Sequence, residues 1–341
     1  MNRISCGRSC DMPSMSEAGN RGVGKVTIEI VRYSPKHETV WDEWCRNAGN
    51  ATFLHTRKFL SYHRDRFEDA SILFYDSGRL VGVMPAARDL NDSSLVVSHP
   101  GATYGGVVHQ GWLNGARLIE AIENLKSYYG REGYVRFLYK PLPHVYARVP
   151  AQDDLYALFR LGAQRVRCEL SSTIDLSARR APSDRRRRGL KKALTSVTLE
   201  KADSMLAGLW EVIVANLERK YGASPVHQLG ELTNLKSLFP DNILIRCATV
   251  DSRVEAGVVF FNSPNVWHAQ YIASSEKGYA VSALDAVFET SIEEARRAGA
   301  RYFDFGTSNG DGGRSLNDGL YRFKSEFGGG GTVHECYELV L

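Results

Sequence analysis

Arg301-Tyr-Phe-Asp-Phe-Gly-Thr-Ser308 and, shortly after it, Leu316-Asn-Asp-Gly-Leu-Tyr-Arg-Phe-Lys-Ser-Glu-Phe-Gly328 form the stretch of sequence that decides the fold. In the first segment Asp304 lies between Phe303 and Phe305, so apolar and polar residues alternate. An alternation with a period of two that ends at a glycine is typical of a β-strand, and the aromatic residues indicate that this strand is buried. We therefore predict a core strand at residues 301–305, followed by a polar loop.

The second segment predicts a short helix after that loop. Its apolar residues recur at spacings of three and four, so they share one face of a helix that ends at Gly328 (Leu320, Phe323 and Phe327). Lys324 directly follows Phe323 and lies on another face. A strand that ends in Asp-x-Gly, a loop rich in Gly, Asn and Asp, and a lysine on a helix anchored by phenylalanines together favour the wall of an active site.

The motifs Asp304-Phe-Gly306 and Phe323-Lys-x-x-Phe-Gly328 resemble the closing motif of the Fem-type branch of the GNAT acyltransferases. This branch includes aminoacyl-tRNA-dependent peptidoglycan transferases and many GNAT-like proteins associated with surface-polysaccharide synthesis. The resemblance extends from about residue 26 to the end of the chain and is most specific in its last fifth. It implies an α/β (α+β) fold of two tandem GNAT-like domains, each a mixed central sheet flanked by helices.

Length and composition agree with an ordinary globular protein. A chain of 341 residues is long for one core, so we expect one very large domain or two of moderate size. Hydrophobic residues make up 43% and charged residues 24%, which is typical of soluble globular proteins. The net charge of +4 is small, so an anionic partner has to be met by a local basic patch rather than by the whole surface.

The sequence gives no sign of a metal site, a disulfide framework or a membrane span. The six cysteines are scattered and form no Cys-x-x-Cys pair, so we expect reduced thiols in a cytoplasmic protein. No apolar run approaches the ~18 residues that a transmembrane helix needs, and the N-terminus lacks a secretory apolar core. Residues 1–24 are rich in Gly, Ser and Asn, and we expect either a disordered tail or a start upstream of the true initiator.

The order of the predicted elements occurs twice. A hairpin at residues 71–84 is followed by a helix at 116–129 and a strand at 134–139, and a second hairpin at 243–261 is followed by a helix at 281–298 and the strand at 301–305. A repeat of this size is too long for a solenoid and indicates two similar α/β domains, although any two hairpins look alike. We place the boundary near residue 178, which gives domains at 25–178 and 179–341.

Shorter predicted elements complete both halves. We expect strands at 26–33, 95–98, 171–176 and 266–271, and helices at 39–48, 56–66, 151–161 and 179–192. The last of these helices has one apolar ridge and an otherwise cationic surface.

Lys324 is the first candidate catalytic residue. In the Fem-type transferases that the motif resembles, the Phe-Lys pair lies at the donor site, and the resemblance transfers this role to Phe323 and Lys324. There the lysine supplies positive charge near the reacting ester. A ribose hydroxyl is a poorer leaving group than a thiol with a pKa of about 8.5, so an ammonium group would help an ester donor most. The alternative is a solvated surface lysine.

Three further residues are candidates for proton transfer. Asp304 could accept a proton from the amine or fix Lys324, although a strand carboxylate between aromatic residues more often has backbone partners or faces water. His268, in the middle of a predicted strand, is a possible general base, and the alternative is a packed or surface histidine. Tyr321 is a possible acid toward the leaving group.

The turn that would hold a CoA diphosphate is degenerate. GNAT proteins usually bind this group at a helix N-terminus with Gln/Arg-x-x-Gly-x-Gly/Ala, where backbone N–H groups and the helix dipole favour an anion. Here Ser275 stands where the family has Gln or Arg. The candidate cofactor-binding residues are Ser275, Lys277, Gly278 and Ala280. As a plain helix start, this turn needs no ligand.

The basic helix at residues 179–192 is the main candidate for contacts with phosphates. Arg186, Arg187 and Lys191 could bind the phosphates of tRNA or of a nucleotide-linked acceptor, and the alternative is a solvated helix face. The glycine-rich loop at 99–106, with Tyr104, could line the acceptor cleft. No Gly-x-Gly-x-x-Gly and no Walker sequence occurs in the chain.

We therefore predict an N-acyltransferase that moves an acyl group, most simply acetyl, from acyl-CoA to an amine. By resemblance, the acceptor is a small molecule or a glycan precursor of the cell envelope or of a polysaccharide, and the reaction needs no metal. The first alternative is a Fem-type transferase that uses aminoacyl-tRNA and acts on a peptidoglycan-like precursor. The second is a non-catalytic RNA-binding or scaffold protein with the same fold.

Overall fold

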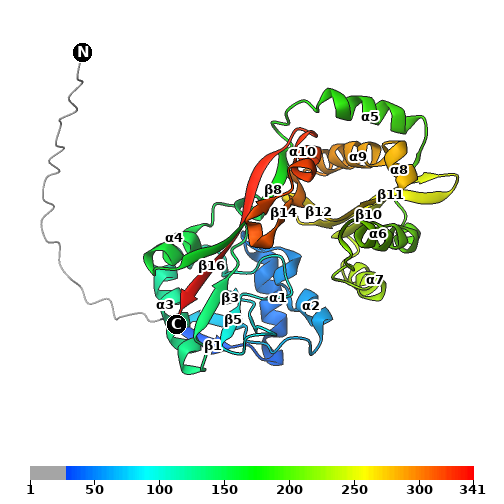
Figure 1. Cartoon of the computed structure of the whole chain (residues 1–341). Helices are drawn as coiled ribbons and strands as arrows, with labels where there is room; N and C mark the ends of the chain where they lie inside the picture. The colour runs from blue at the N-terminus through cyan, green and yellow to red at the C-terminus, as the bar shows by residue number, and fades with distance from the viewer. Residues whose placement is uncertain (1–27) are drawn as a thin grey trace, which may run out of the picture.

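The computed structural model describes residues 28–341, and the tail predicted at residues 1–24 lies outside this part. Two main sheets organise the described chain (Figure 1). The small sheet has the strand order β1-β2-β3-β6, and the large, ten-stranded sheet has the order β4-β5-β7-β16-β8-β13-β12-β11-β10-β9. The predicted α/β class, with mixed sheets flanked by helices, is confirmed.

The strands of the small sheet are β1 (Glu29–Arg32), β2 (Ile72–Asp76), β3 (Arg79–Met84) and β6 (Val108–His109). The strands of the large sheet are β4 (Ala87–Arg88), β5 (Leu95–Val97), β7 (Arg136–Tyr139), β8 (Gln164–Asp175), β9 (Thr198–Glu200), β10 (Ile243–Val250), β11 (Arg253–Asn262), β12 (Val266–Ser274), β13 (Tyr302–Thr307) and β16 (Gly330–Val340). A two-stranded ribbon joins β14 (Asn309–Gly310) to β15 (Ser315–Leu316).

The helices are α1 (Glu38–Asn47), α2 (Arg57–Leu60), α3 (Ala116–Arg131), α4 (Asp153–Arg160), α5 (Asp184–Leu194), α6 (Leu206–Tyr221), α7 (Leu229–Leu238), α8 (Glu276–Ala280), α9 (Ala283–Arg297) and α10 (Asp318–Ser325). Helix α9 packs its apolar face on one side of the large sheet, against residues such as Phe260 and Phe303. Helix α6 packs on the opposite side, where Leu209 and Ile213 meet Ile245. This end of the large sheet is therefore covered on both faces.

The two halves of the chain share the large sheet. The long C-terminal strand β16 pairs with β7 of the first half and with β8, which precedes the predicted boundary at residue 178. Figure 1 shows β8 and β16 extending from one half of the molecule to the other. A further apolar cluster joins the halves, because Tyr62 and Tyr146 pack with Leu209 and Phe239. The division of the sequence into two domains near residue 178 therefore remains a proposal. Strands from the two sides of this boundary pair with each other.

Two helices start or end differently from the expectation. The helix expected at 56–66 is only the single turn α2 followed by a 3₁₀ turn, because the backbone leaves the helical region at Arg64, where φ is 52°. The helix expected at 179–192 starts at Asp184, and the side chain of Ser183 caps it by accepting a hydrogen bond from the N–H of Arg186. We predicted no elements where α6, α7 and β16 lie.

Candidate active site

The candidate site forms where β12 and β13 separate. The two strands are parallel neighbours at three pairs of residues, of which His268–Asp304 is the last. Beyond this pair β12 continues to Ser274 and β13 to Thr307 without further pairing between them. Gly306 follows with a φ of +75°, a conformation that glycine adopts readily and that turns β13 away. The splayed strands leave a gap in the sheet with His268 and Asp304 at its closed end.

A cavity of about 1030 Å³ occupies this gap, and we call it the central cavity. Strands β12 and β13, helices α6 and α10, and strands β8 and β16 contribute its walls. Ala102, Thr103 and Lys140 add lining residues from the first half of the chain. The cavity is therefore enclosed by both halves, and it is large enough for a small ligand.

Asp304 is the buried centre of a hydrogen-bond network. Its side chain has no exposed surface, and it accepts hydrogen bonds from His268 Nδ1 at 2.7 Å, Tyr146 Oη at 2.7 Å and Thr173 Oγ1 at 2.8 Å. Ser171 Oγ donates a fourth. Burial would raise the pKa of Asp304, but the hydrogen bond from His268, together with the positive charge that His268 carries when it is protonated, outweighs burial and holds that pKa well below its ordinary value.

This network orients His268. An ionised Asp304 accepts from Nδ1, so the neutral imidazole carries its proton there and leaves Nε2 as an acceptor. Within the described chain Nε2 has no hydrogen-bond partner, and His268 lines the central cavity. The arrangement suits a general base at the cavity wall, and it leaves no free oxygen on Asp304 for the direct proton transfer that we considered for that residue.

Lys324 lies beside the same cavity and is not a solvated surface lysine. It is only 4% exposed, and its ammonium group donates to the carbonyl oxygens of Gly306 at 2.9 Å and Thr307 at 2.7 Å. An ammonium group has three N–H donors, so one remains for a ligand. Burial lowers the pKa of Lys324 to about 8, although the negative charge of Asp304 opposes this shift.

Gly306 brings the base and the ammonium group together. Its carbonyl oxygen accepts the hydrogen bond from Lys324, and the position that a Cβ would take at Gly306 lies 3.4 Å from Cε1 of His268. The imidazole and the ammonium group therefore flank one glycine of β13, on the wall of one cavity.

Phe323 also lines the central cavity, and Arg186 packs behind it. The guanidinium carbon of Arg186 lies 4.8 Å from the centre of the Phe323 ring, and the same group pairs with Asp285 at 3.1 Å and Glu326 at 3.2 Å. Arg186 is 7% exposed. It is therefore not on the cationic outer face where we expected a substrate contact, because it ties α5 to α9 and α10.

The structure places Tyr321 and Tyr104 outside the lining of the central cavity. Tyr321 carries its hydroxyl beside Gly331 of β16. Tyr104 is buried, donates to Thr52 Oγ1 at 3.1 Å and contacts the Tyr146 ring in a tilted arrangement, while its neighbours Ala102 and Thr103 reach the cavity. Roles for both tyrosines remain predictions, and the contacts of these side chains give them no support.

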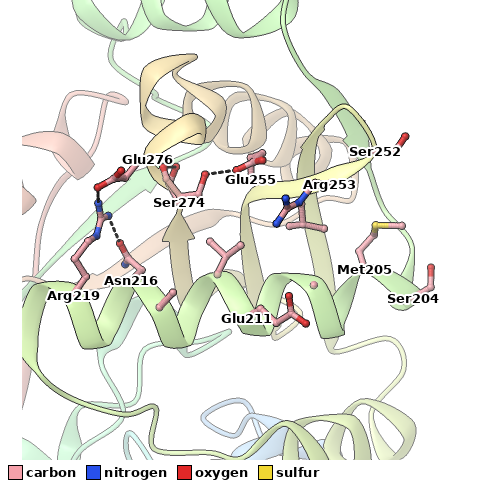
Figure 2. A pocket seen from close by; sticks show the side chains of 15 residues that line it. Ser204, Met205, Glu211, Asn216, Arg219, Ser252, Arg253, Glu255, Ser274 and Glu276 are labelled. Carbon is pink, nitrogen blue, oxygen red and sulfur yellow. Dashed lines mark hydrogen bonds and ion pairs between the residues drawn. The ribbon is translucent and has the colours of Figure 1, made fainter.

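Figure 2 shows the surroundings of the turn predicted to hold a phosphate. A groove of about 570 Å³ beside this turn is lined by Glu211, Glu255 and Glu276, and Arg219 is paired with Glu276 at 2.8 Å. The hydroxyl of Ser275 accepts from the N–H of Gly278 at 2.9 Å and donates to Glu255. On this side the turn is already hydrogen-bonded, and the groove combines the three glutamates with Arg219 and Arg253.

The other residues of this turn also have structural neighbours. Lys277 is exposed and pairs with Asp251 at 2.7 Å, and Ala280 is exposed. A Cβ at Gly278 would clash with the backbone of Glu255, so packing alone requires glycine there. Phosphate binding by Ser275, Lys277, Gly278 and Ala280 therefore remains a prediction.

Of the three candidates on α5, only Arg186 lines a cavity, together with three cationic side chains that are not candidates. Arg185, Arg188 and Lys192 line a cavity of about 340 Å³ between α5 and the start of α9. Arg187 pairs with Asp184 on the exposed side of the helix, and Lys191 is also exposed. Arg185, Arg188 and Lys192 are spaced by three and four residues, so the sequence alone could have shown that they share one side of a helix.

Sequence reasoning missed several polar residues of the central cavity. His334 on β16 is 8% exposed, and its Nε2 has no partner in the part of the chain that the structure describes. Lys140 donates to the carbonyl oxygen of His99 at 3.2 Å, and burial lowers its pKa to about 8. Arg167 and Glu169 of β8 pair at 2.6 Å on the same wall. No motif marks these residues, since the fold alone brings them together.

Residues 28–341 contain no group of three or more His, Cys, Asp or Glu side chains that could hold a metal ion. None of the helices in this range combines the length and the apolar character that crossing a membrane requires.

Comparison with known proteins identifies the fold. Residues 177–325 match the family model described as an acetyltransferase (GNAT) domain, and this range contains His268, Asp304, Phe323 and Lys324. A comparison with the sequences of curated proteins finds no match.

Several solved structures match nearly the whole chain. FemX superposes with a TM-score of 0.66 at 13% identity over 92% of this chain and 97% of its own. L-PGS from Bacillus licheniformis gives a TM-score of 0.59 at 13% identity over 90% and 92%. A tandem GNAT protein from the clavulanic acid biosynthesis pathway gives 0.51 at 11% identity over 92% and 98%. At such low identity these matches establish the fold.

Proposed function

We propose that this chain, a GNAT acyltransferase with the tandem fold of the Fem-type branch, transfers an acyl group from an acyl thioester of CoA to an amine. The observation that carries the proposal is the central cavity, which has an Asp304-oriented imidazole and a buried ammonium group on one wall. A base for the amine and a positive charge for the leaving group are the two aids that aminolysis of a thioester needs.

In the proposed reaction, the neutral amine attacks the acyl carbon, and the C–N bond forms. His268 Nε2 accepts the proton that the nitrogen loses. Asp304 holds the imidazole in the required tautomer and stabilises the imidazolium that results. The C–S bond then breaks and the thiolate leaves. The free N–H of Lys324 stabilises the negative charge that develops during these steps.

The acceptor that we propose is an amino-bearing precursor of a cell-envelope polymer or polysaccharide, handled in the cytoplasm. Support comes from the polar wall contributed by the first half of the chain and by β8, where Lys140, Arg167 and Glu169 can hydrogen-bond hydroxyl, phosphate or carboxylate groups. Amino sugars and short amino-acid derivatives are therefore the first acceptors to test.

The test is acyl transfer from acetyl-CoA to a panel of amino sugars and amino acids, measured by release of the CoA thiol. We expect His268→Ala to lower kcat by on the order of a hundredfold or more, because general base catalysis typically contributes this much. His144→Ala is the matched control, since His144 is exposed and does not line the central cavity. Full activity of a folded His268→Ala variant, checked by circular dichroism, would contradict the assignment of the base.

A second candidate donor is aminoacyl-tRNA. The observation in its favour is the third N–H of Lys324, which has no partner among residues 28–341 and lies beside the cavity, because an ester leaving group needs more help than a thiol. FemX and L-PGS share the fold. Transfer from charged tRNA, together with no transfer from any acyl-CoA, would decide for this donor. Binding of either donor without turnover would instead indicate a non-catalytic binding protein.

A further inference from the structure

We propose that the cationic edge of α5 holds the phosphate groups of a CoA-type donor whose acyl end reaches the central cavity. We call the cavity of about 340 Å³ beside this edge the α5 cavity. The inference rests on the proposed function and adds a binding site to it, on a helix that precedes the splayed strands.

The α5 cavity and the central cavity adjoin. Tyr279 and Leu284, from α8 and α9, line both of them. A ligand with its reactive end beside Lys324 can therefore extend past these two side chains toward α5. A long, flexible donor with an anionic end has this shape, whereas a compact acyl donor would leave the α5 cavity empty.

The charges of the α5 cavity suit a diphosphate. Arg185, Arg188 and Lys192 line it, and none of the three has an acidic partner among residues 28–341. Asp285 also lines the cavity, but Arg186 neutralises it at 3.1 Å. The balance of charge is therefore positive. Guanidinium groups match phosphate oxygens in pairs, so two arginines one helical turn apart form a natural phosphate clamp.

Packing fixes the position of this cationic edge. The backbone of α5 approaches α9 so closely at Gly189 that a Cβ there would clash with the side chain of Asp285. Arg186 adds ion pairs to Asp285 and Glu326 on the same side. The cations are therefore presented by a rigid helix rather than by a loop, which lowers the entropic cost of binding an anion.

The predicted phosphate turn and the α5 cavity are neighbours. Gly278 and Ser274 line the α5 cavity from the opposite side, while Glu255 and Glu276 border the groove on the other face of the same turn. An anion is therefore favoured between α5 and α8 rather than in the groove, where three glutamates offset Arg219 and Arg253. This explains how the site can hold phosphates although Ser275 replaces the family's Gln or Arg.

The test compares two donors that share the reactive end. Acetyl-CoA carries the nucleotide, and S-acetylpantetheine lacks it. We expect the double variant Arg188→Glu/Lys192→Glu to raise the KM for acetyl-CoA at least about tenfold, since each charged contact is worth on the order of a tenfold change. Its kcat/KM for S-acetylpantetheine should stay within about twofold of the wild type.

A second variant separates the cavity edge from the outer face of α5. Arg187→Glu/Lys191→Glu makes the same change in net charge on the exposed side of the helix. We expect it to raise the KM for acetyl-CoA much less than the cavity-edge variant. Equal effects of the two variants would overturn the inference, because a general electrostatic effect would then explain both.

Direct binding keeps the test independent of turnover. Titration calorimetry of the wild-type protein should show CoA binding that weakens with salt, and the cavity-edge variant should lose this binding. If wild-type protein binds CoA and uses acetyl-CoA while the cavity-edge variant does so equally well, the inference fails and the proposed function stands. If the wild type binds no CoA and α5 variants instead lose tRNA binding, both fail.

Discussion

At the scale of single residues, the burial of Lys324 costs stability, and the proposed reaction uses its charge. An ammonium group that is 4% exposed and faces two carbonyls has lost most of its hydration without gaining a carboxylate contact. Burial of this kind is costly, and it lowers the pKa of Lys324 to about 8. Groups held in such an unfavourable state are characteristic of functional sites.

This shift predicts the pH dependence of the reaction. Because the folded pKa of Lys324 is below its ordinary value, the charged form is present below about pH 8 and is lost as the pH rises through that value. We expect kcat with acetyl-CoA to fall over this range at saturating acceptor. Lys324→Met should lower kcat on the order of a hundredfold and remove this alkaline limb.

Lys140 supplies the control for this experiment. It lines the same cavity, and burial lowers its pKa to about 8 as well, so the pH profile of the wild type alone does not identify the lysine. Lys140→Met should keep the alkaline limb of kcat. If the limb disappears in Lys140→Met and persists in Lys324→Met, the charge that matters to catalysis belongs to Lys140.

The sequence identified the residue types of the site better than their roles. Lys324, Phe323 and His268, which a motif and a single strand histidine singled out, line one cavity, and their roles stay predictions. The hydrogen bond from His268 to Asp304 was not predictable, because the four partners that saturate this carboxylate come from separate segments of the chain. His334 gave no signal, since its position depends on where β16 pairs.

At the scale of elements, the sequence patterns predicted those helices and strands whose formation depends on residues close together in the chain. The hairpin β10–β11 and the strand β13 follow their alternation, and α10 follows its spacing of three and four. Strand β16 begins within a run of glycines and pairs with partners far away in the sequence, so it reads as a loop. For α6 the signal was present, since Leu206, Leu209 and Ile213 recur at helical spacing, and we assigned no helix to it.

The splay of β12 from β13 depends on Gly306, and this gives a prediction for one element. Gly306→Ala forces an alanine to adopt a φ of +75° and places a methyl group 3.4 Å from Cε1 of His268. We expect a loss of about 1 kcal/mol in the free energy of unfolding from the backbone alone. We also expect kcat to fall at least about tenfold, because the base and Lys324 both contact this residue.

Gly299 provides the matched substitution. Its φ is +82°, and no atom lies within 4 Å of the position that a Cβ would take. Gly299→Ala should therefore cost a similar free energy of unfolding and leave kcat near that of the wild type. Denaturant unfolding measures the first quantity and steady-state kinetics the second. Similar kcat losses in both variants would mean that Gly306 acts only through stability.

At the scale of the whole molecule, the C-terminal strand β16 connects the two predicted sequence units. Leu339, near the end of β16, is 2% exposed in the apolar cluster that contains Ile72 and Phe137 of the first half. The same strand carries His334 into the central cavity. The C-terminal strand thus completes both the core of the first half and the wall of the site.

This shared strand predicts that the first half cannot fold by itself. A fragment of residues 28–178 would leave β7 and β8 without β16, with unpaired edges that favour aggregation, and would uncover the apolar residues that Leu339 now covers. We expect the fragment to be insoluble when expressed alone. Co-expression with residues 179–341 should yield a soluble complex, because β16 can then pair in trans, and the intact chain should unfold in one urea transition. A soluble 28–178 fragment with its own cooperative transition would instead establish two independent domains and make the pairing of β16 secondary to stability.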